Sequence, residues 1–189
     1  MKQNQTFKRV YVVGDSYVGK STLVYRLLNG IVDVDLSVTK PDELKSVFTV
    51  IESSEVQYEI IDIKGNDLYF MYNCSEIAKS ADLVLMVYDV SNIDSLKVCM
   101  SRVDVMSEVL TSFKPIIFVG NKHDQMDQNQ NQIEALLKQV VNRKYTNYEI
   151  IHSIFVSSLE GRNLANLHEV IMKSLGFEDK SEYFFVCNN

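Results

Sequence analysis

The sequence lacks the features that define several broad protein classes. Its three cysteines, Cys74, Cys99 and Cys187, are odd in number, widely spaced and without a metal-ligand pattern. Such cysteine usage favours a reducing, cytoplasmic compartment. No apolar run is long enough to cross a bilayer, and residues 1–5 contain no signal-peptide core.

Positive charge is also scarce. The 19 Lys and Arg residues against 25 Asp and Glu leave a net charge of −6, which argues against a nucleic-acid partner held by electrostatics and against a polybasic membrane anchor. The chain has no internal repeat and no Gly/Ser linker. Its 189 residues suit one α/β domain. We expect that domain at residues 1–176, with a C-terminal tail at 177–189.

The most informative stretch is a glycine, four residues, and then Gly-Lys-Ser. Its members are Gly14, Asp15, Ser16, Tyr17, Val18, Gly19, Lys20 and Ser21. It follows an apolar run at residues 10–13 and opens a helical pattern that continues through Thr22, the strand–loop–helix setting of a phosphate-binding loop. Backbone N–H groups of such a loop converge on phosphate oxygens. Lys20 is expected to neutralise the β- and γ-phosphates, and Ser21 to offer its hydroxyl to Mg²⁺.

Apolar runs alternate with helical periodicities along the remaining chain. Strand-like runs lie at 45–51, 57–63, 83–88, 116–119 and 150–156, and helical patterns at 67–79, 96–110, 133–141 and 164–175. The first two runs should form an antiparallel hairpin after an irregular loop at 31–44. The alternation predicts an α/β fold with a six-stranded, mainly parallel sheet, one antiparallel edge strand, and helices on both faces.

Ligands of such sheets bind at the carboxyl ends of the strands. The loops after residues 13, 63, 119 and 156 should therefore meet at one rim. One of them reads Asn121-Lys122-His123-Asp124. The carboxylate of Asp124 matches the paired N–H donors of guanine, which adenine lacks, so a wrong base would leave it unpaired. Lys122 is expected to lie along the base, and Asn121 to tie this loop to the phosphate loop, whereas His123 is expected to be structural.

A second rim loop follows the run at 57–63. Asp62 lies near the end of this run, beside the phosphate loop, and is expected to hold Mg²⁺ indirectly. Gly65 offers a backbone N–H to a γ-phosphate. Thr39, in the irregular loop, is a candidate for a second hydroxyl on the metal.

These motifs stand in the order found in the Ras superfamily of small GTPases, which the chain resembles over residues 7–175. Ser16 and the run at 87–92 look most like the Rab branch. The resemblance implies a single P-loop GTPase domain that binds GTP or GDP with Mg²⁺, hydrolyses GTP, and acts in vesicle trafficking or signalling. It also implies that Ser21 and Thr39 coordinate Mg²⁺ directly and Asp62 through water. Residues closing over the base edge would be Ser157, Ser158 and Leu159.

The same resemblance suggests partners. Residues of about 33–43 and 64–76 correspond to the two switch regions, which a γ-phosphate orders and its loss releases. They are the expected contacts for effector proteins, with an exchange factor and a GTPase-activating protein as further partners. The oligomeric state is open.

Several residues depart from the family pattern. Asn66 stands where a glutamine usually orients the attacking water, and its side chain is shorter by roughly 1.5 Å, so we expect slow hydrolysis. Lys64 replaces an alanine and has two open interpretations, a solvent-facing side chain or a contact with the phosphate and metal. Val32 replaces an aromatic residue that packs on guanine, which predicts weak binding and fast exchange. Leu159 replaces a lysine, and Tyr17 replaces a small residue and is a candidate cover for the nucleotide.

The tail also departs from the family. Cys187 is third from the end and fits no prenylation signal, so no lipid anchor is evident. The apolar residues 183–186 leave three interpretations open: packing on the domain, dimerisation, or the start of a further segment. A degenerate, non-hydrolysing nucleotide-binding module is the alternative function, and the motif at 121–124 disfavours a kinase or ATPase.

Overall fold

The chain forms one sheet flanked by helices. The computed structural model describes residues 6–29, 34–35, 45–51, 56–109, 114–126, 130–142 and 148–177. The elements are β1 (Thr6–Val13), α1 (Lys20–Asn29), β2 (Val34–Asp35), β3 (Lys45–Ile51), β4 (Val56–Ile63), α2 (Asp67–Ser80), β5 (Leu83–Asp89), α3 (Ile93–Val109), β6 (Lys114–Asn121), the 3₁₀ turn η1 (His123–Gln125), α4 (Gln130–Val141), β7 (Tyr148–Phe155) and α5 (Leu164–Ser174). The predictions for Val32, Thr39 and the tail beyond Phe177 lie outside the described residues.

The sheet has the predicted class but one strand more than expected. Over the described residues its order is β2-β3-β4-β1-β5-β6-β7, in seven strands. Strands β4, β1, β5, β6 and β7 run parallel, and the hairpin β3–β4 is antiparallel as predicted. The six-strand count was wrong because Val34–Asp35 pairs antiparallel with Thr49 and Val50 at the edge of the sheet. A strand of two residues is too short to show an alternating pattern in the sequence.

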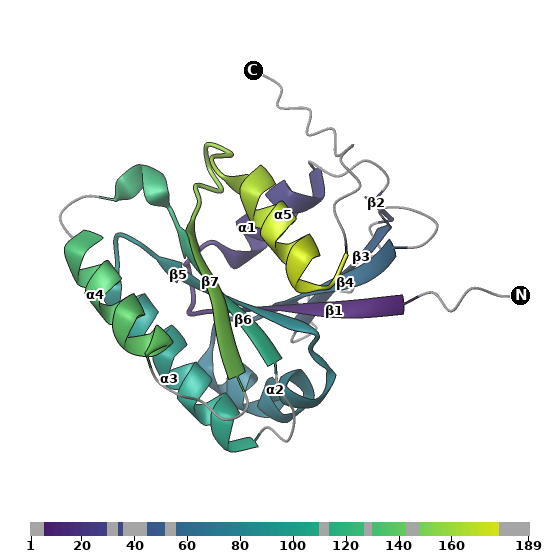
Figure 1. The fold of residues 1–189 in the computed structure, drawn as a ribbon, viewed down its shortest axis with the longest axis horizontal. Helices are drawn as coiled ribbons and strands as arrows, with labels where there is room; N and C mark the ends of the chain where they lie inside the picture. Colours follow the sequence, from purple (N-terminus) through teal and green to yellow (C-terminus); the bar gives the residue numbers. More distant parts are fainter. Residues whose placement is uncertain are drawn as a thin grey trace, which may run out of the picture.

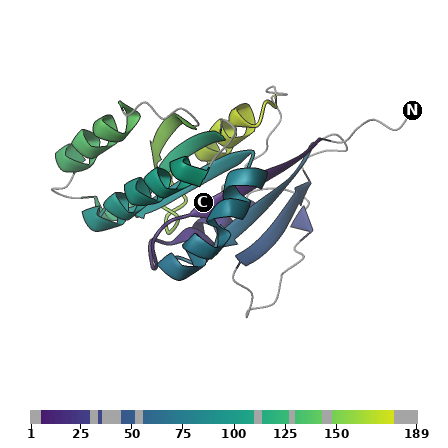
Figure 2. The same ribbon diagram turned by 90° about the horizontal axis from the view of Figure 1, so that it is seen from below.

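Alternation along β1 divides the helices between two faces. Val10 and Val12 pack with the helices α1 and α5, whereas Tyr11 and Val13 pack with α2, α3 and α4. Figure 1 shows α1 and α5 on one side of the sheet and α2, α3 and α4 on the other, and Figure 2 gives the same layers from below. Because both faces are covered, the central strand β5 is buried at every position.

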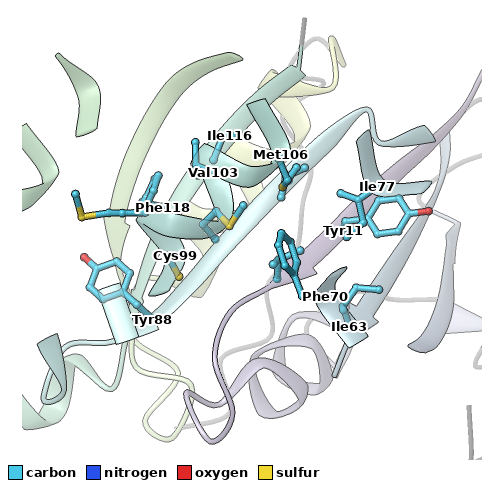
Figure 3. Packing of buried hydrophobic residues seen from close by; sticks show 14 of the residues in the cluster. Tyr11, Ile63, Phe70, Ile77, Tyr88, Cys99, Val103, Met106, Ile116 and Phe118 are labelled. Carbon is cyan, nitrogen blue, oxygen red and sulfur yellow. The ribbon is translucent and has the colours of Figure 1, made fainter. Parts of the chain in front are cut away.

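The hydrophobic cluster under α2 and α3 fixes the position of α2 on the sheet. Phe70 and Ile77 of α2 and Met106 of α3 meet Tyr11 of β1 in this cluster (Figure 3). All four side chains are at most 2% exposed, so truncating one of them to alanine would cost about 2–5 kcal/mol. This packing holds the N-terminal end of α2 beside the carboxyl end of β4.

The helices are amphipathic. In α1, Leu23, Val24 and Leu27 are buried, while Tyr25 and Arg26 face solvent. A spacing of three to four residues between buried positions is what a helix with one face on a sheet requires. Among the helices that the structure describes, none is long and apolar enough to cross a bilayer.

Candidate functional site

The loops that follow β1, β4, β6 and β7 converge at one rim, as the sequence predicted. Ser21 donates a hydrogen bond to Asp62, which joins the start of α1 to the end of β4. Asn121 donates to the carbonyl of Val18 and accepts from Ser158, which joins the other two loops to the phosphate loop. The parallel strands therefore bring four separate motifs to one surface.

The phosphate loop has the expected strand–loop–helix geometry, with α1 beginning at Lys20. Gly19 has φ +90°, and a Cβ there would lie 2.4 Å from Nδ2 of Asn121, so only glycine fits. Tyr17 also adopts a left-handed conformation, with φ +63°, and its side chain is 95% exposed. Of the remaining loop residues, Gly14 and Val18 are buried, Asp15 is half-buried, and Ser16 and Thr22 are exposed.

Lys20 points into the phosphate loop. Its side chain is 7% exposed, and Nζ donates to the carbonyl oxygen of Asp15 at 2.6 Å. Burial lowers the pKa of Lys20, and the charge of Asp62 opposes that shift. A buried ammonium whose bond within the described residues is to one carbonyl is suited to receive a stronger anionic partner.

Asp62 and Ser21 provide oxygen atoms suited to a hard cation. Ser21 Oγ donates to Asp62 Oδ2 at 2.5 Å, while Asp62 Oδ1 is buried without a hydrogen-bond partner among the described residues. Burial raises the pKa of Asp62, and the bond from Ser21 and the charge of Lys20 oppose the rise. The described residues contain no group of three or more His, Cys, Asp or Glu that could hold a metal. The pair nevertheless fits Mg²⁺, because this ion often binds one or two protein groups together with substrate phosphates and water.

The segment after β4 touches the phosphate loop through Gly65. A Cβ on Gly65 would lie 2.4 Å from the backbone N of Ser16, so this close approach requires glycine. Asn66 is the N-cap of α2, and its Oδ1 accepts from the Leu68 N–H at 2.8 Å. Lys64 is exposed, and its Nζ lies 5.4 Å from the ring centroid of Tyr69, which favours the surface interpretation of this residue.

Asn121 links three loops. Its Nδ2 donates to the Val18 carbonyl at 2.9 Å, and its Oδ1 accepts from the backbone N–H of Ser158 at 3.0 Å and from its hydroxyl at 2.7 Å. The side chain is 2% exposed. The hydrogen-bonding capacity of this buried amide is therefore used to align the phosphate loop with the two loops expected at the base.

The residues expected at the base lie next to one another. Asp124 accepts from the hydroxyl of Ser157 at 2.5 Å. His123 stacks on Phe155 with ring centroids 5.6 Å apart, which agrees with the structural role expected for it. Leu159 is 68% exposed at the edge of the site.

Asp89 is a site residue to which the sequence analysis gave no role. It accepts from Lys122 Nζ at 2.6 Å, and its other oxygen accepts from the N–H and hydroxyl of Ser91. Burial opposes its ionisation, but the hydrogen bonds from Lys122 and Ser91 outweigh burial and lower its pKa. The position of Asp89 at the carboxyl end of β5 was the available signal, because that end faces the same rim.

Arg102 of α3 is the second residue that sequence reasoning missed. It is 3% exposed, and its Nη2 donates to the carbonyl of Gly65 and to Asp67. An arginine three residues after Cys99, on the buried stripe of α3, was the signal that could have marked it.

Comparison with known proteins agrees with this geometry. Residues 9–175 match the family model described as the Ras family. The chain is 29% identical over 184 residues to the GTPase Era of Clostridioides difficile, a match that covers 93% of this chain and 57% of that protein.

Two further relatives are similar over shorter shares of their length. The GTPase Der of Aeromonas salmonicida is 24% identical over 176 residues, covering 86% of this chain and 33% of that protein. A Ras and EF-hand domain-containing protein homolog of Mus musculus is 28% identical over 142 residues, and the match covers 71% of this chain and 22% of that protein. The chain thus spans 57% or less of the length of these relatives.

Proposed function

The chain belongs to the Ras family and carries a P-loop GTPase domain, and from that premise we propose that it is a Mg²⁺-dependent guanine-nucleotide switch with slow intrinsic hydrolysis. The observation that carries the proposal is the bridge made by Asn121. It joins the phosphate loop through Val18 to the loops of Asp124 and Ser158. A nucleotide lying across this bridge has its phosphates at Lys20 and its base at Asp124.

The phosphates bind where the described residues offer positive charge. Lys20 exchanges the Asp15 carbonyl for phosphate oxygens, and the N–H groups of the phosphate loop and of α1 surround the same anion. Ser21 and Asp62 hold the metal ion, which when bound neutralises phosphate charge and polarises the bond to be cleaved. Thr39 is the proposed second hydroxyl ligand.

Guanine is selected by Asp124. Two carboxylate oxygens match the N1–H and exocyclic amino group of guanine, and an adenine would leave that carboxylate without donors. The bond from Ser157 holds Asp124 in place, Ser158 and Leu159 border the base, and Lys122 lies along it. We also propose weak binding and fast exchange, because Val32 replaces an aromatic contact worth about 1–3 kcal/mol.

Hydrolysis in this proposal is attack of water in line with the γ-phosphate. Lys20 and the N–H of Gly65 stabilise the developing charge. Asn66 is poorly placed to orient the water, because its amide oxygen caps α2 through Leu68. The short side chain and this cap both predict slow turnover.

The outer face of α2 is the proposed partner surface. Leu68, Met71 and Tyr72 are 78%, 58% and 77% exposed, an unusual grouping for large apolar side chains on one helix. Together with residues of about 33–43, this face is where effector proteins, an exchange factor and a GTPase-activating protein would bind. Membership of the Rab branch, a role in trafficking or signalling, and a cytoplasmic location belong to the same proposal.

Nucleotide titration by calorimetry tests the proposal. GTP and GDP should bind in the presence of Mg²⁺, and ATP should not. Asp124→Asn replaces one acceptor by a donor, so GTP affinity should fall by about a hundredfold, while xanthosine triphosphate, with a carbonyl in place of the guanine amino group, should bind. Equal affinity of the unaltered protein for ATP and GTP would refute base selection.

Hydrolysis separates the switch from the alternative, a non-hydrolysing module that acts only through its partner surface. Single-turnover phosphate release should be slow but measurable, and faster in Asn66→Gln. Asn66→Ser is the matched control, because serine keeps a helix cap but carries no amide. Release at one rate in all three proteins would remove Asn66 from the mechanism, and binding without release would favour the module.

A further inference from the structure

Arg102 is a buried charge that the proposed chemistry does not use. It lies on α3 among apolar neighbours that include Cys99, Val103 and Met106, and it is 3% exposed. Burying a guanidinium is costly unless it is paired and hydrogen-bonded. The contacts of Arg102 therefore indicate which part of the protein the buried guanidinium stabilises.

Within the described residues, the hydrogen bonds and the ring contact of Arg102 are all made with one short segment. Nη2 donates to the carbonyl oxygen of Gly65 and to Oδ1 of Asp67, both at 2.8 Å. The guanidinium carbon lies 5.0 Å from the ring centroid of Phe70. One side chain of α3 thus holds the last part of the loop after β4 and the first turn of α2.

Gly65 lies between Arg102 and the phosphate loop. Its carbonyl faces Arg102, and a Cβ on its Cα would lie 2.4 Å from Ser16 N and 2.5 Å from Asp15 O. Any movement of Gly65 is therefore limited on one side by the phosphate loop and on the other by the guanidinium. The charge of Arg102 also reaches Lys20, whose pKa is lowered mainly by burial and further by Arg102.

The guanidinium is incompletely compensated. Its Nε and Nη1 are buried without a partner among the described residues, and Asp67, the carboxylate that pairs with it there, is 85% exposed at the side chain. A solvated carboxylate screens a buried cation only in part. Excess positive charge therefore remains beside Gly65.

We propose that Arg102 is a positioning residue that makes the site favour a nucleoside triphosphate over a diphosphate. The inference rests on the proposed function, in which the Gly65 N–H contacts the γ-phosphate. Arg102 holds Gly65 against the phosphate loop, ready for that contact, and its excess charge attracts the additional negative charge of the triphosphate. A diphosphate leaves the γ position empty and gains little from either effect.

The test compares the affinities of GDP and a non-hydrolysable GTP analogue with Mg²⁺ in the full chain. Arg102→Met removes every donor but preserves an unbranched apolar stem. We expect affinity for the GTP analogue to fall about tenfold, the effect of one hydrogen bond to a charged group, while GDP affinity changes less than about twofold. A purely structural role would lower both affinities equally, and that result overturns the inference.

Three further variants keep the test decisive. Arg102→Lys keeps the charge but loses the planar fork, so it should lower the ratio of GTP-analogue affinity to GDP affinity by less than Arg102→Met. Asp67→Asn keeps the bond from Arg102 to the Gly65 carbonyl but removes the carboxylate that screens the guanidinium, so it should raise this ratio. Both variants serve if Arg102→Met does not fold. An unchanged ratio in both would overturn the inference. Arg9→Met is the matched control, because Arg9 pairs with Glu59 at an exposed site in β1 and should leave both affinities unaltered. If the unaltered chain binds neither nucleotide, the proposed function itself fails; if it binds both and the ratio never moves, only the role of Arg102 fails.

Discussion

The two ends of the site differ in how completely their polar groups are satisfied. At the end proposed to bind the base, the buried amide of Asn121 and the carboxylates of Asp89 and Asp124 all have partners within the protein. At the phosphate end, Asp62 Oδ1 and two nitrogens of Arg102 are buried without partners among the described residues. Among the same described residues, Lys20 donates only to the backbone carbonyl of Asp15.

This difference indicates that one end of the site is already formed without ligand, whereas the other gains partners when a ligand binds. The base end is held in place by its own hydrogen bonds, so binding there requires little reorganisation. At the phosphate end, Lys20 and Asp62 Oδ1 are the groups that an anion and a metal ion would complete, so binding there supplies partners that the protein lacks. Loss of a hydrogen-bonded group at the base end should therefore lower the stability of the ligand-free protein as well as ligand affinity, whereas loss of Lys20 at the phosphate end should lower mainly ligand affinity.

The largest effect is expected for Lys20→Ala. Loss of the charged contacts to two phosphates should weaken GTP and GDP binding by about a hundredfold or more. The free energy of unfolding without ligand should change little, because within the described part of the chain Lys20 donates only to the Asp15 carbonyl and its burial is costly. Calorimetric titration measures the nucleotide affinity, and urea unfolding measures the stability without ligand. A large loss of ligand-free stability would contradict the proposed difference between the two ends of the site.

Asn121→Ala should show the opposite pattern. It removes the bond to Val18 and both bonds from Ser158, so the ligand-free protein should lose about 3 kcal/mol of unfolding free energy. Ser158→Ala is the control, because it removes only the hydroxyl bond and should cost about 1 kcal/mol. Urea unfolding without nucleotide checks both variants, and a loss in Asn121→Ala no larger than the control would show that the three loops are not held by this amide.

Asp89→Asn should lower the stability of the ligand-free protein by an amount that depends on pH. The folded-state pKa of Asp89 is lowered below its ordinary value of 3.8, so its contribution is present above that value and is lost as pH falls through the folded pKa. The substitution should cost about 1.5–3 kcal/mol at neutral pH. The difference in unfolding free energy between the two proteins should shrink below pH 3.8. A difference that stays constant from neutral to acidic pH would rule out the charge of Asp89 as its source.

Tyr17→Gly should give the smallest effect. A left-handed conformation costs a non-glycine residue roughly 1–2 kcal/mol, and the flexibility of glycine in the unfolded chain returns part of that, so a net gain of about 0.5–1 kcal/mol in ligand-free stability is expected. Tyr17→Asn, which tolerates this conformation, should gain less. Thermal unfolding compares the three proteins, and a loss of stability in Tyr17→Gly would mean that the exposed ring makes a favourable contact.

Most of the fold followed from local patterns. The strand–loop–helix of the phosphate loop, the hairpin β3–β4 and the helices α3, α4 and α5 each carry their own periodicity or spacing in the sequence. Even the weak pattern of α2 was confirmed, because its apolar positions fit the cluster beneath it. The edge strand β2 was missed, since its pairing with β3 is a tertiary event that two residues cannot encode.

The candidate site also divides into residues that local patterns indicate and residues that only tertiary contacts bring together. The residues of the phosphate loop and of the motif at 121–124 could be proposed from the sequence because their spacing alone indicates the chemistry. The ion pair of Asp89 with Lys122 joins residues 33 positions apart, and the bond of Arg102 to Gly65 joins residues 37 positions apart. No local pattern contains such contacts.

The sequence by itself determined the class of fold, the family resemblance and the chemical types at the rim, because these depend on residue order and short-range spacing. Only the tertiary structure decided that Asn66 caps α2, that Asn121 joins three loops, and that a buried arginine lies behind Gly65. The physical reason is that hydrogen bonding and burial depend on which atoms meet after the sheet has assembled. Those contacts determine which polar groups have hydrogen-bond partners within the protein and which can gain one from a ligand.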